Sequence, residues 1–309
     1  MFDIDWVIAL AGLGVGGVVG LTGMGGGALM TPILVLLFGV PPSVAVASDL
    51  AASLFMKPLG AAIHMRRGTV DGGLVRWLCI GSIPMAFLGA ALINQLGHTA
   101  EVDAMMKRGL GGALLVAALA TLAKAALKSR RTAEPGQSAL PLAVRPLPTL
   151  VIGAVGGLVV GMTSVGSGSL VIVMLMLVYP RLTGSRLVGT DLAQAIPLVG
   201  SAALGHVVFG HVHLDLTASL LAGSIPGVLA GAHYSSRGSD AWVRPLLVVV
   251  LMASALKLLG ASNAAVGAAA TVLGGIGIAI GLRSRDGAAA LSDETPLAPA
   301  AVIDGPPGR

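Results

Sequence analysis

Long apolar runs, interrupted by glycine and by short polar stretches, set the pattern of this chain. No charged residue occurs from 6 to 48, from 146 to 180 or from 258 to 282. A helix needs roughly 20 apolar residues to cross the hydrocarbon core of a bilayer, so these runs allow several membrane spans. Run lengths and breaks predict apolar segments at 5–22, 26–39, 44–64, 72–94, 105–127, 147–163, 167–180, 187–208, 215–235, 242–260 and 264–282.

Two of these segments are too short to cross a membrane. Segments 26–39 and 167–180 reach only about 20 Å as helices, against a hydrocarbon core of ~30 Å. Each is therefore expected to form a V with the segment before it, so that the chain returns to the side it left. The apices of the two Vs fall at "GMGGG" (23–27) and "SVGSG" (164–168).

The chain also repeats itself. A shift of 141 residues places "GLTGMGGGAL" from Gly20 over "GMTSVGSGSL" from Gly161, and one inserted residue later the tetrapeptide "GSIP" at 81–84 recurs at 223–226. We interpret the chain as a duplicated membrane unit, and glycine breaks at matching places in two halves point to the binding site of a transporter. The predicted parts are a first repeat (1–127), a cytoplasmic linker (128–146), a second repeat (147–285) and a disordered tail rich in Ala and Pro (286–309).

Charge then orients the unit. The composition is 55% hydrophobic and 11% charged, far from that of soluble domains, and the net charge of +5 comes mostly from short loops. With the N-terminus outside, nearly all basic loops and the C-terminus fall on the cytoplasmic side, as the positive-inside rule requires. Each half then makes an odd number of crossings. The predicted fold is an all-α, multi-pass protein of the cell membrane with two inverted-topology repeats, and nucleic acid is not an expected partner.

The glycines at the two apices have two interpretations. Packing between helices accounts for those spaced as GxxxG: Gly12, Gly16, Gly20 and their repeats Gly153, Gly157 and Gly161. Three consecutive glycines at an apex exceed what packing needs, and each apex opens a helix whose first amides carry partial positive charge. A Cβ at Gly26 is expected to obstruct the approach of these amides to an anion. The predicted anion-binding residues of the apices are Thr22, Gly25, Gly26, Gly27, Thr163, Gly166, Ser167 and Gly168.

The apices, the Ser-Asp and Thr-Asp pairs that follow them and the tandem halves together resemble the sulfite exporter TauE/SafE family of membrane permeases, over residues 5–282. The resemblance implies a secondary transporter that exports small sulfur-containing anions, such as sulfite or organosulfonates, across the cytoplasmic membrane. The second apex departs from the all-glycine pattern, because Ser167 stands where the first apex has Gly26.

Polar residues within the spans are costly and mark functional sites. Asp49 and Asp191 occupy equivalent positions, preceded by Ser48 and Thr190. In one interpretation, which we favour because both halves have an aspartate, each caps backbone amides or orients an apex. In the other, one of them is protonated and couples transport to the proton gradient. Lys57 either attracts the anion or pairs with Asp49, or it extends its ammonium to the membrane surface, and Gln194 is a candidate donor to substrate oxygens.

Other chemistry is weakly indicated. "HVVFGHVHLD" (206–215) places His206, His211, His213 and Asp215 around an outer loop, for which a solvated loop or a weak proton relay is favoured and no metal site is predicted. No cofactor or enzymatic activity is predicted, since no P-loop, GxSxG or HExxH motif occurs. Cys79 is expected to be structural. The alternatives to a transporter are a membrane scaffold and an intramembrane enzyme. The expected partners are a small anion and the bilayer, and a homo-oligomer is left open.

Overall fold

The computed structural model describes residues 4–22, 26–97, 99–129, 143–210, 212–235 and 240–275. The predicted tail (286–309), most of the predicted linker, Gly25 and the side chain of Thr22 lie outside this description. The described chain is helical and carries no named strand, which confirms the predicted all-α class. Its helices are α1 (Trp6–Thr22), α2 (Gly27–Leu37), α3 (Pro42–Arg66), α4 (Gly72–Gln95), α5 (Ala100–Ser129), α6 (Pro146–Thr163), α7 (Leu170–Val178), α8 (Gly184–Phe209), α9 (Leu214–Ser235) and α10 (Asp240–Leu258), followed by Asn263–Gly275.

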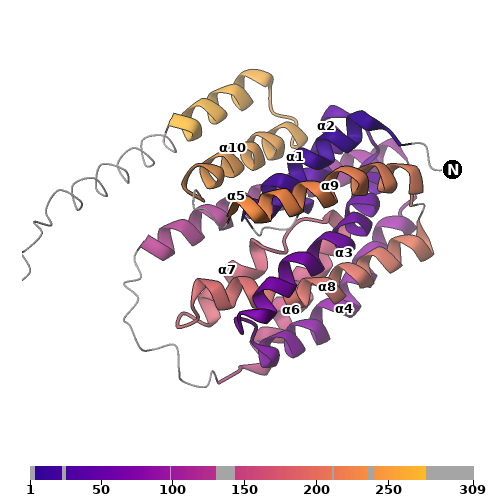
Figure 1. The fold of residues 1–309 in the computed structure, drawn as a ribbon. Coiled ribbons are helices and arrows are strands. Elements are labelled where there is room, and N and C mark those ends of the chain that lie inside the picture. The colour runs from indigo at the N-terminus through magenta and orange to yellow at the C-terminus, as the bar shows by residue number, and fades with distance from the viewer. Residues whose placement is uncertain are drawn as a thin grey trace, which may run out of the picture.

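Six of the described helices are long and apolar enough to cross a membrane. They are α3, α4, α6, α8, residues Ala100–Ala123 of α5 and residues Leu214–Gly231 of α9. The axes of most helices lie along roughly the same line in the bundle (Figure 1). Large apolar side chains that face outward, such as Trp6 and Leu37, suit a surface in contact with lipid.

Both predicted helix breaks are present. In the first half α1 ends at Thr22 and α2 begins at Gly27, and in the second half α6 ends at Thr163 and α7 begins at Leu170. With 11 residues in α2 and 9 in α7, the two helices are about 16 and 14 Å long. Neither can cross a core of ~30 Å alone, as the sequence predicted.

The two halves interlock reciprocally. Helix α1 packs along α9, and its repeat counterpart α6 packs along α4, the counterpart of α9. In the same way α3 contacts α9 while α8 contacts α4, and α2 contacts α10 while α7 contacts α5. Two further extensive contacts join a helix directly to its own repeat counterpart: α3 packs against α8, and α5 packs against α10. The largest of these helix contacts are therefore preserved when the halves are exchanged. Inversion of the halves across the membrane stays a prediction.

Glycines permit the closest of these contacts, which confirms the packing interpretation of the GxxxG series. A Cβ at Gly16 of α1 would collide with the backbone of Ser224 in α9, and a Cβ at Gly157 of α6 would collide with the backbone of Ser82 in α4. Ser82 and Ser224 are the serines of the two "GSIP" copies. Backbones can approach this closely only where side chains are missing. The duplicated tetrapeptide is thus part of a duplicated helix interface.

Two glycines of α1 provide a matched test of this interface. Gly16→Ala forces a methyl group into the α9 backbone and should lower stability by about 1–3 kcal/mol. Gly14→Ala, with nothing within 4 Å of the added Cβ, should be neutral or stabilise by up to about 1 kcal/mol through helix propensity. Thermal unfolding of the purified protein in detergent measures both variants. Equal melting temperatures for the two variants would contradict the interface.

Candidate functional site

The two apices meet in the interior. The carbonyl oxygen of Ser164, in the second apex, lies against Gly27, the first residue of α2, so closely that a Cβ on Gly27 would overlap it. Ser164 adopts a left-handed conformation with φ of 58° as the C-cap of α6, and its amide donates to the carbonyl of Val160. This conformation ends α6 and directs the chain across to the first half. Two residues 137 positions apart, one from each half, are thereby in contact.

Asp49 lies at this junction. It is 1% exposed on α3, and its Oδ2 accepts hydrogen bonds from the hydroxyls of Thr31 (2.7 Å) and Ser164 (2.8 Å). Its Oδ1 is buried and has no hydrogen-bond partner among the described residues, and it lies 4.0 Å from where a Cβ on Gly26 would be. No described backbone amide donates to Asp49. The carboxylate therefore holds the second apex through the hydroxyl of Ser164, and among the described residues its hydrogen-bond donors are hydroxyls.

Lys57 lies two helical turns further along α3. Its side chain is buried, 6% exposed, and Nζ donates to Oγ of Ser167 at 2.6 Å. Asp191 and Asp49 lie within electrostatic range of the ammonium. Lys57 therefore points inward to the second apex and does not extend to the membrane surface. The two acidic residues and the lysine form one buried charged group across α3 and α8.

Asp191 is held differently from its repeat counterpart. Its Oδ1 accepts from Nε2 of Gln194 at 3.2 Å, and Oε1 of Gln194 accepts from the hydroxyl of Ser82 at 3.3 Å. Gln194 thus uses one amide hydrogen within the protein and retains a second donor. Ser48, next to Asp49, is buried on α3, and its hydroxyl has no partner among the described residues.

The second apex has three backbone amides that come before the first helical hydrogen bond of α7. The first four-residue hydrogen bond of α7 runs from Leu170 to the carbonyl of Gly166, so the amides of Gly166, Ser167 and Gly168 precede the helical ladder. Gly166 (φ 129°) and Gly168 (φ 90°) have conformations that side chains disfavour. The hydroxyl of Thr163 is occupied within its own segment, because it donates to the carbonyl of Val159 and accepts from the amide of Val165.

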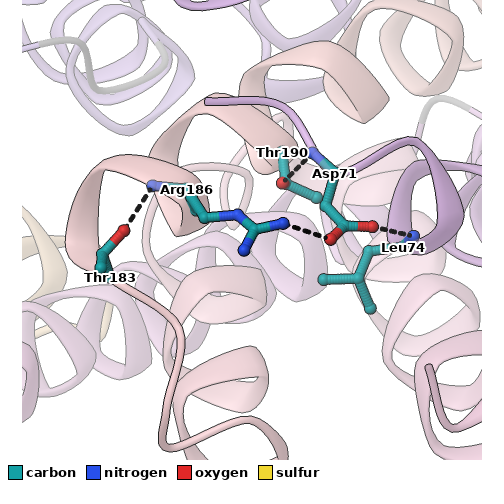
Figure 2. A network of polar contacts seen from close by, with 5 residues as sticks. All are labelled: Asp71, Leu74, Thr183, Arg186 and Thr190. Carbon is teal, nitrogen blue, oxygen red and sulfur yellow. Dashed lines mark hydrogen bonds and ion pairs between the residues drawn. The ribbon is translucent and has the colours of Figure 1, made fainter. Parts of the chain in front are cut away.

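A polar network lies next to this group, around the start of α4 (Figure 2). Oδ1 of Asp71 accepts from the amide of Leu74 and caps α4, and its Oδ2 forms an ion pair with Arg186 at 2.9 Å. The amide of Asp71 donates to Oγ1 of Thr190 at 3.0 Å. Arg186 lies in the first turn of α8, where Oγ1 of Thr183 accepts from its amide. Thr190, the neighbour of Asp191, thus joins the α3–α4 loop to α8.

The expected outer histidine loop is partly wrong. His206 belongs to α8 and is 1% exposed, with Nε2 against the carbonyl of Gly161 and Nδ1 against Nδ2 of Asn94. A carbonyl can only accept, so Nε2 carries the proton and Nδ1 accepts from the asparagine amide. His206 is consequently a neutral residue that joins α8 to α6 and α4. No cluster able to hold a metal occurs among the described residues.

Sequence reasoning missed three residues of the site. Thr31, Ser82 and Ser164 bond to Asp49 or Gln194 from other helices. Thr31 carried the clearest signal, as a hydroxyl within the apolar segment 26–39. Ser164 lies inside the second apex, for which the sequence predicted a role only for the residues from Gly166 to Gly168. Which serines of the chain face a carboxylate depends on contacts between helices far apart in sequence.

Two neighbouring glycines of the first apex provide a second matched test of packing. Gly26 has φ of −59°, which any residue adopts, and its added Cβ would meet the flexible end of Met56 at 3.1 Å. Gly27→Ala should therefore disrupt the apex contact with the Ser164 backbone and lower the melting temperature by several degrees, whereas Gly26→Ala should be mild. Thermal unfolding with size-exclusion profiles tests this order. A reversed order would mean that the apices are not packed in this way.

Comparisons with known proteins place the chain in a family. The family model described as "Sulfite exporter TauE/SafE" matches residues 8–258. The chain is 39% identical over 253 residues to "Probable membrane transporter protein YjnA" of Bacillus subtilis, covering 82% of this chain and 98% of that protein. It is 27% identical over 220 residues to "Probable membrane transporter protein YdhB" of the same organism, and the match covers 71% of this chain and 85% of that protein. No solved structure matches the chain. The chain therefore belongs to the sulfite exporter TauE/SafE family and is a membrane transporter.

Proposed function

We propose that this transporter is a secondary exporter of small sulfur-containing oxyanions, such as sulfite or organosulfonates, across the cytoplasmic membrane. The observation that carries the proposal is the buried ammonium of Lys57, hydrogen-bonded to Ser167 at the apex that opens α7. Among residues whose burial the structure describes, it is the one buried lysine or arginine. A charge at this depth is costly and is retained where a substrate or ion needs it.

The groups around Lys57 suit an oxyanion that must also leave. The hydroxyl of Ser167 and the amides of Gly166 and Gly168 are neutral donors at the partially positive end of α7. One ammonium supplies long-range attraction, and neutral donors replace part of the hydration shell without holding the anion permanently. Sulfite and sulfonates present three oxygens to such donors. The export direction rests on what the family is named for.

The alternatives explain less of the site. A membrane scaffold would account for the glycine interfaces but gives no reason to bury two aspartates and a lysine together. An intramembrane enzyme would need a nucleophile next to a base. His206, the buried histidine, is instead engaged with a backbone carbonyl and Asn94.

Transport by reconstituted protein tests the proposal. Lys57→Gln should reduce uptake of labelled sulfite into liposomes by at least about tenfold, because the buried charge that attracts the anion is lost. Lys107→Gln, a matched change at an exposed lysine of α5, should stay within about twofold of the parent. Size-exclusion profiles establish that both variants are folded. Parental flux through folded Lys57→Gln would place the anion site elsewhere.

Orientation is tested separately. We propose that the N-terminus is outside and the C-terminus cytoplasmic, with the halves inverted, because this arrangement puts nearly all basic loops inside. In a Cys79→Ser background, a cysteine replacing Thr99 should react with an impermeant maleimide added to intact cells. Cysteines replacing Arg66 or Ala139 should react only after permeabilisation. Labelling of Thr99 and Ala139 positions from the same side would refute the inversion.

A further inference from the structure

We propose that Asp49 binds a proton together with the anion held at Lys57, so that the two cross the membrane as one cargo. This inference rests on the proposed anion transport. It goes further in naming the co-transported ion and the atom that takes it, Oδ1 of Asp49. The alternative role, a purely structural carboxylate that orients the apex, uses only Oδ2.

The first observation is an oxygen that is buried without a partner. Asp49 is 1% exposed, and its Oδ1 has no hydrogen bond within the described chain, although it faces the first apex at Gly26. Buried polar atoms almost always have partners, and an exception calls for a ligand or a change of charge. Protonation at Oδ1 removes the unpaired charge from this site without any movement of Oδ2 and its two hydroxyl donors.

The second observation is the polarity of the broken helix in the second half. Helix α6 ends at Thr163, and the Ser164 that caps it bonds to Asp49. Helix α7 starts six residues later, and Ser167 before it bonds to Lys57. The C-terminal end of a helix is partially negative and the N-terminal end partially positive. The break therefore presents a negative end to the carboxylate and a positive end to the ammonium side, which suits a cation and an anion in adjacent places.

The third observation is the balance of charge. The charged groups around Asp49 come from few elements. Its own helix contributes Lys57, α8 contributes Asp191, which also acts on that lysine, and α2 has no charged residue. On α5 the described charged side chains are Glu101 and Asp103 in the first turn and the exposed Lys107 and Arg108, and on α9 the titratable ones are Asp215 in the first turn and His233 in the last, with the exposed His213 before it. The charged group that acts on Asp49 is Lys57.

One ammonium thus faces two carboxylates. When an anion arrives at Lys57, the site would hold at least three negative charges against one positive charge if both aspartates stayed ionised. Repulsion of this kind is strong in an interior of low dielectric constant. A proton on Asp49 removes one of the negative charges, so anion binding and proton binding favour each other, and by linkage each must strengthen the other.

A proton fits the place better than Na⁺. A proton needs only one oxygen, and Oδ1 of Asp49 is available because the hydroxyls of Thr31 and Ser164 both donate to Oδ2. A Na⁺ ion would need several oxygens around it. The backbone of Gly26 and the end of Met56 lie close to the remaining space. For a dianion such as sulfite, co-transport of one proton still carries one negative charge outward, a movement that a membrane potential negative inside favours.

The test uses liposomes that contain the full-length protein and a trapped pH-sensitive dye, with methanesulfonate as the probe because it stays ionised across the pH range used. An inward gradient of methanesulfonate should acidify the lumen in sodium-free choline buffer, and added Na⁺ should change nothing. Asp49→Asn still accepts from Thr31 and Ser164, so it should fold and keep counterflow of labelled methanesulfonate within about threefold. Its acidification should fall by at least about tenfold. Asp215→Asn, the same change at an exposed aspartate of α9, should behave like the parent.

The outcomes separate this inference from the proposed function. Anion flux in the parent without lumen acidification, or flux that requires Na⁺, overturns proton coupling and leaves anion transport standing. Absence of flux for both methanesulfonate and sulfite overturns the proposed function. In that case infrared difference spectra of purified protein across a pH titration still decide the proton site. A protonated carboxyl band that is present in the parent and Asp215→Asn and missing in Asp49→Asn supports it, and no such band overturns it.

Discussion

Backbone contact between the two halves is the constraint on which the rest of this structure depends. Helix α1 reaches the backbone of α9, and α6 reaches that of α4, only because glycines face the partner helix along each contact. A membrane gives helices no hydrophobic reason to associate, so close packing of this type supplies much of the attraction. The exchange of helices between halves also places each broken segment next to the other half. Without it, Gly27 and Ser164 would not touch.

That contact creates an environment in which charges can be buried. Asp49, Lys57 and Asp191 lie in the interior, and each interacts with a residue from another helix or from the opposite half. The arrangement is unequal in the two halves. Lys57 has Val199 as its counterpart, and the Asp71–Arg186 pair is matched by His213 and Val44 in the repeat alignment. Duplication supplied a symmetric frame, and the polar residues on it have diverged.

This asymmetry has a consequence for how a transporter works. The break in the second half joins the end of α6 to Asp49 through Ser164 and the start of α7 to Lys57 through Ser167, whereas the residue that matches Lys57 in the second half is Val199. The Asp71–Arg186 pair, together with the bond from the amide of Asp71 to Thr190, joins the start of α4 to α8 beside Asp191. A movement of α8 would therefore change both the position of Asp191 and the Asp71–Arg186 ion pair, because Thr190 and Asp191 are neighbours.

Apolar run length, glycine position and internal repetition determined much of this protein from its sequence. They predicted the all-α membrane class, the short second helices, the breaks at both apices and the glycine-lined packing, since these depend on local composition and on helix length against bilayer thickness. The sequence also singled out Asp49, Asp191 and Lys57, because charges in apolar spans stand out. It did not reveal that Thr31 and Ser164 share Asp49, that Gly27 is the tight glycine, or that His206 is a buried link. Those facts depend on contacts between helices that are more than a hundred residues apart in the sequence, and only tertiary packing decides which of those helices come together.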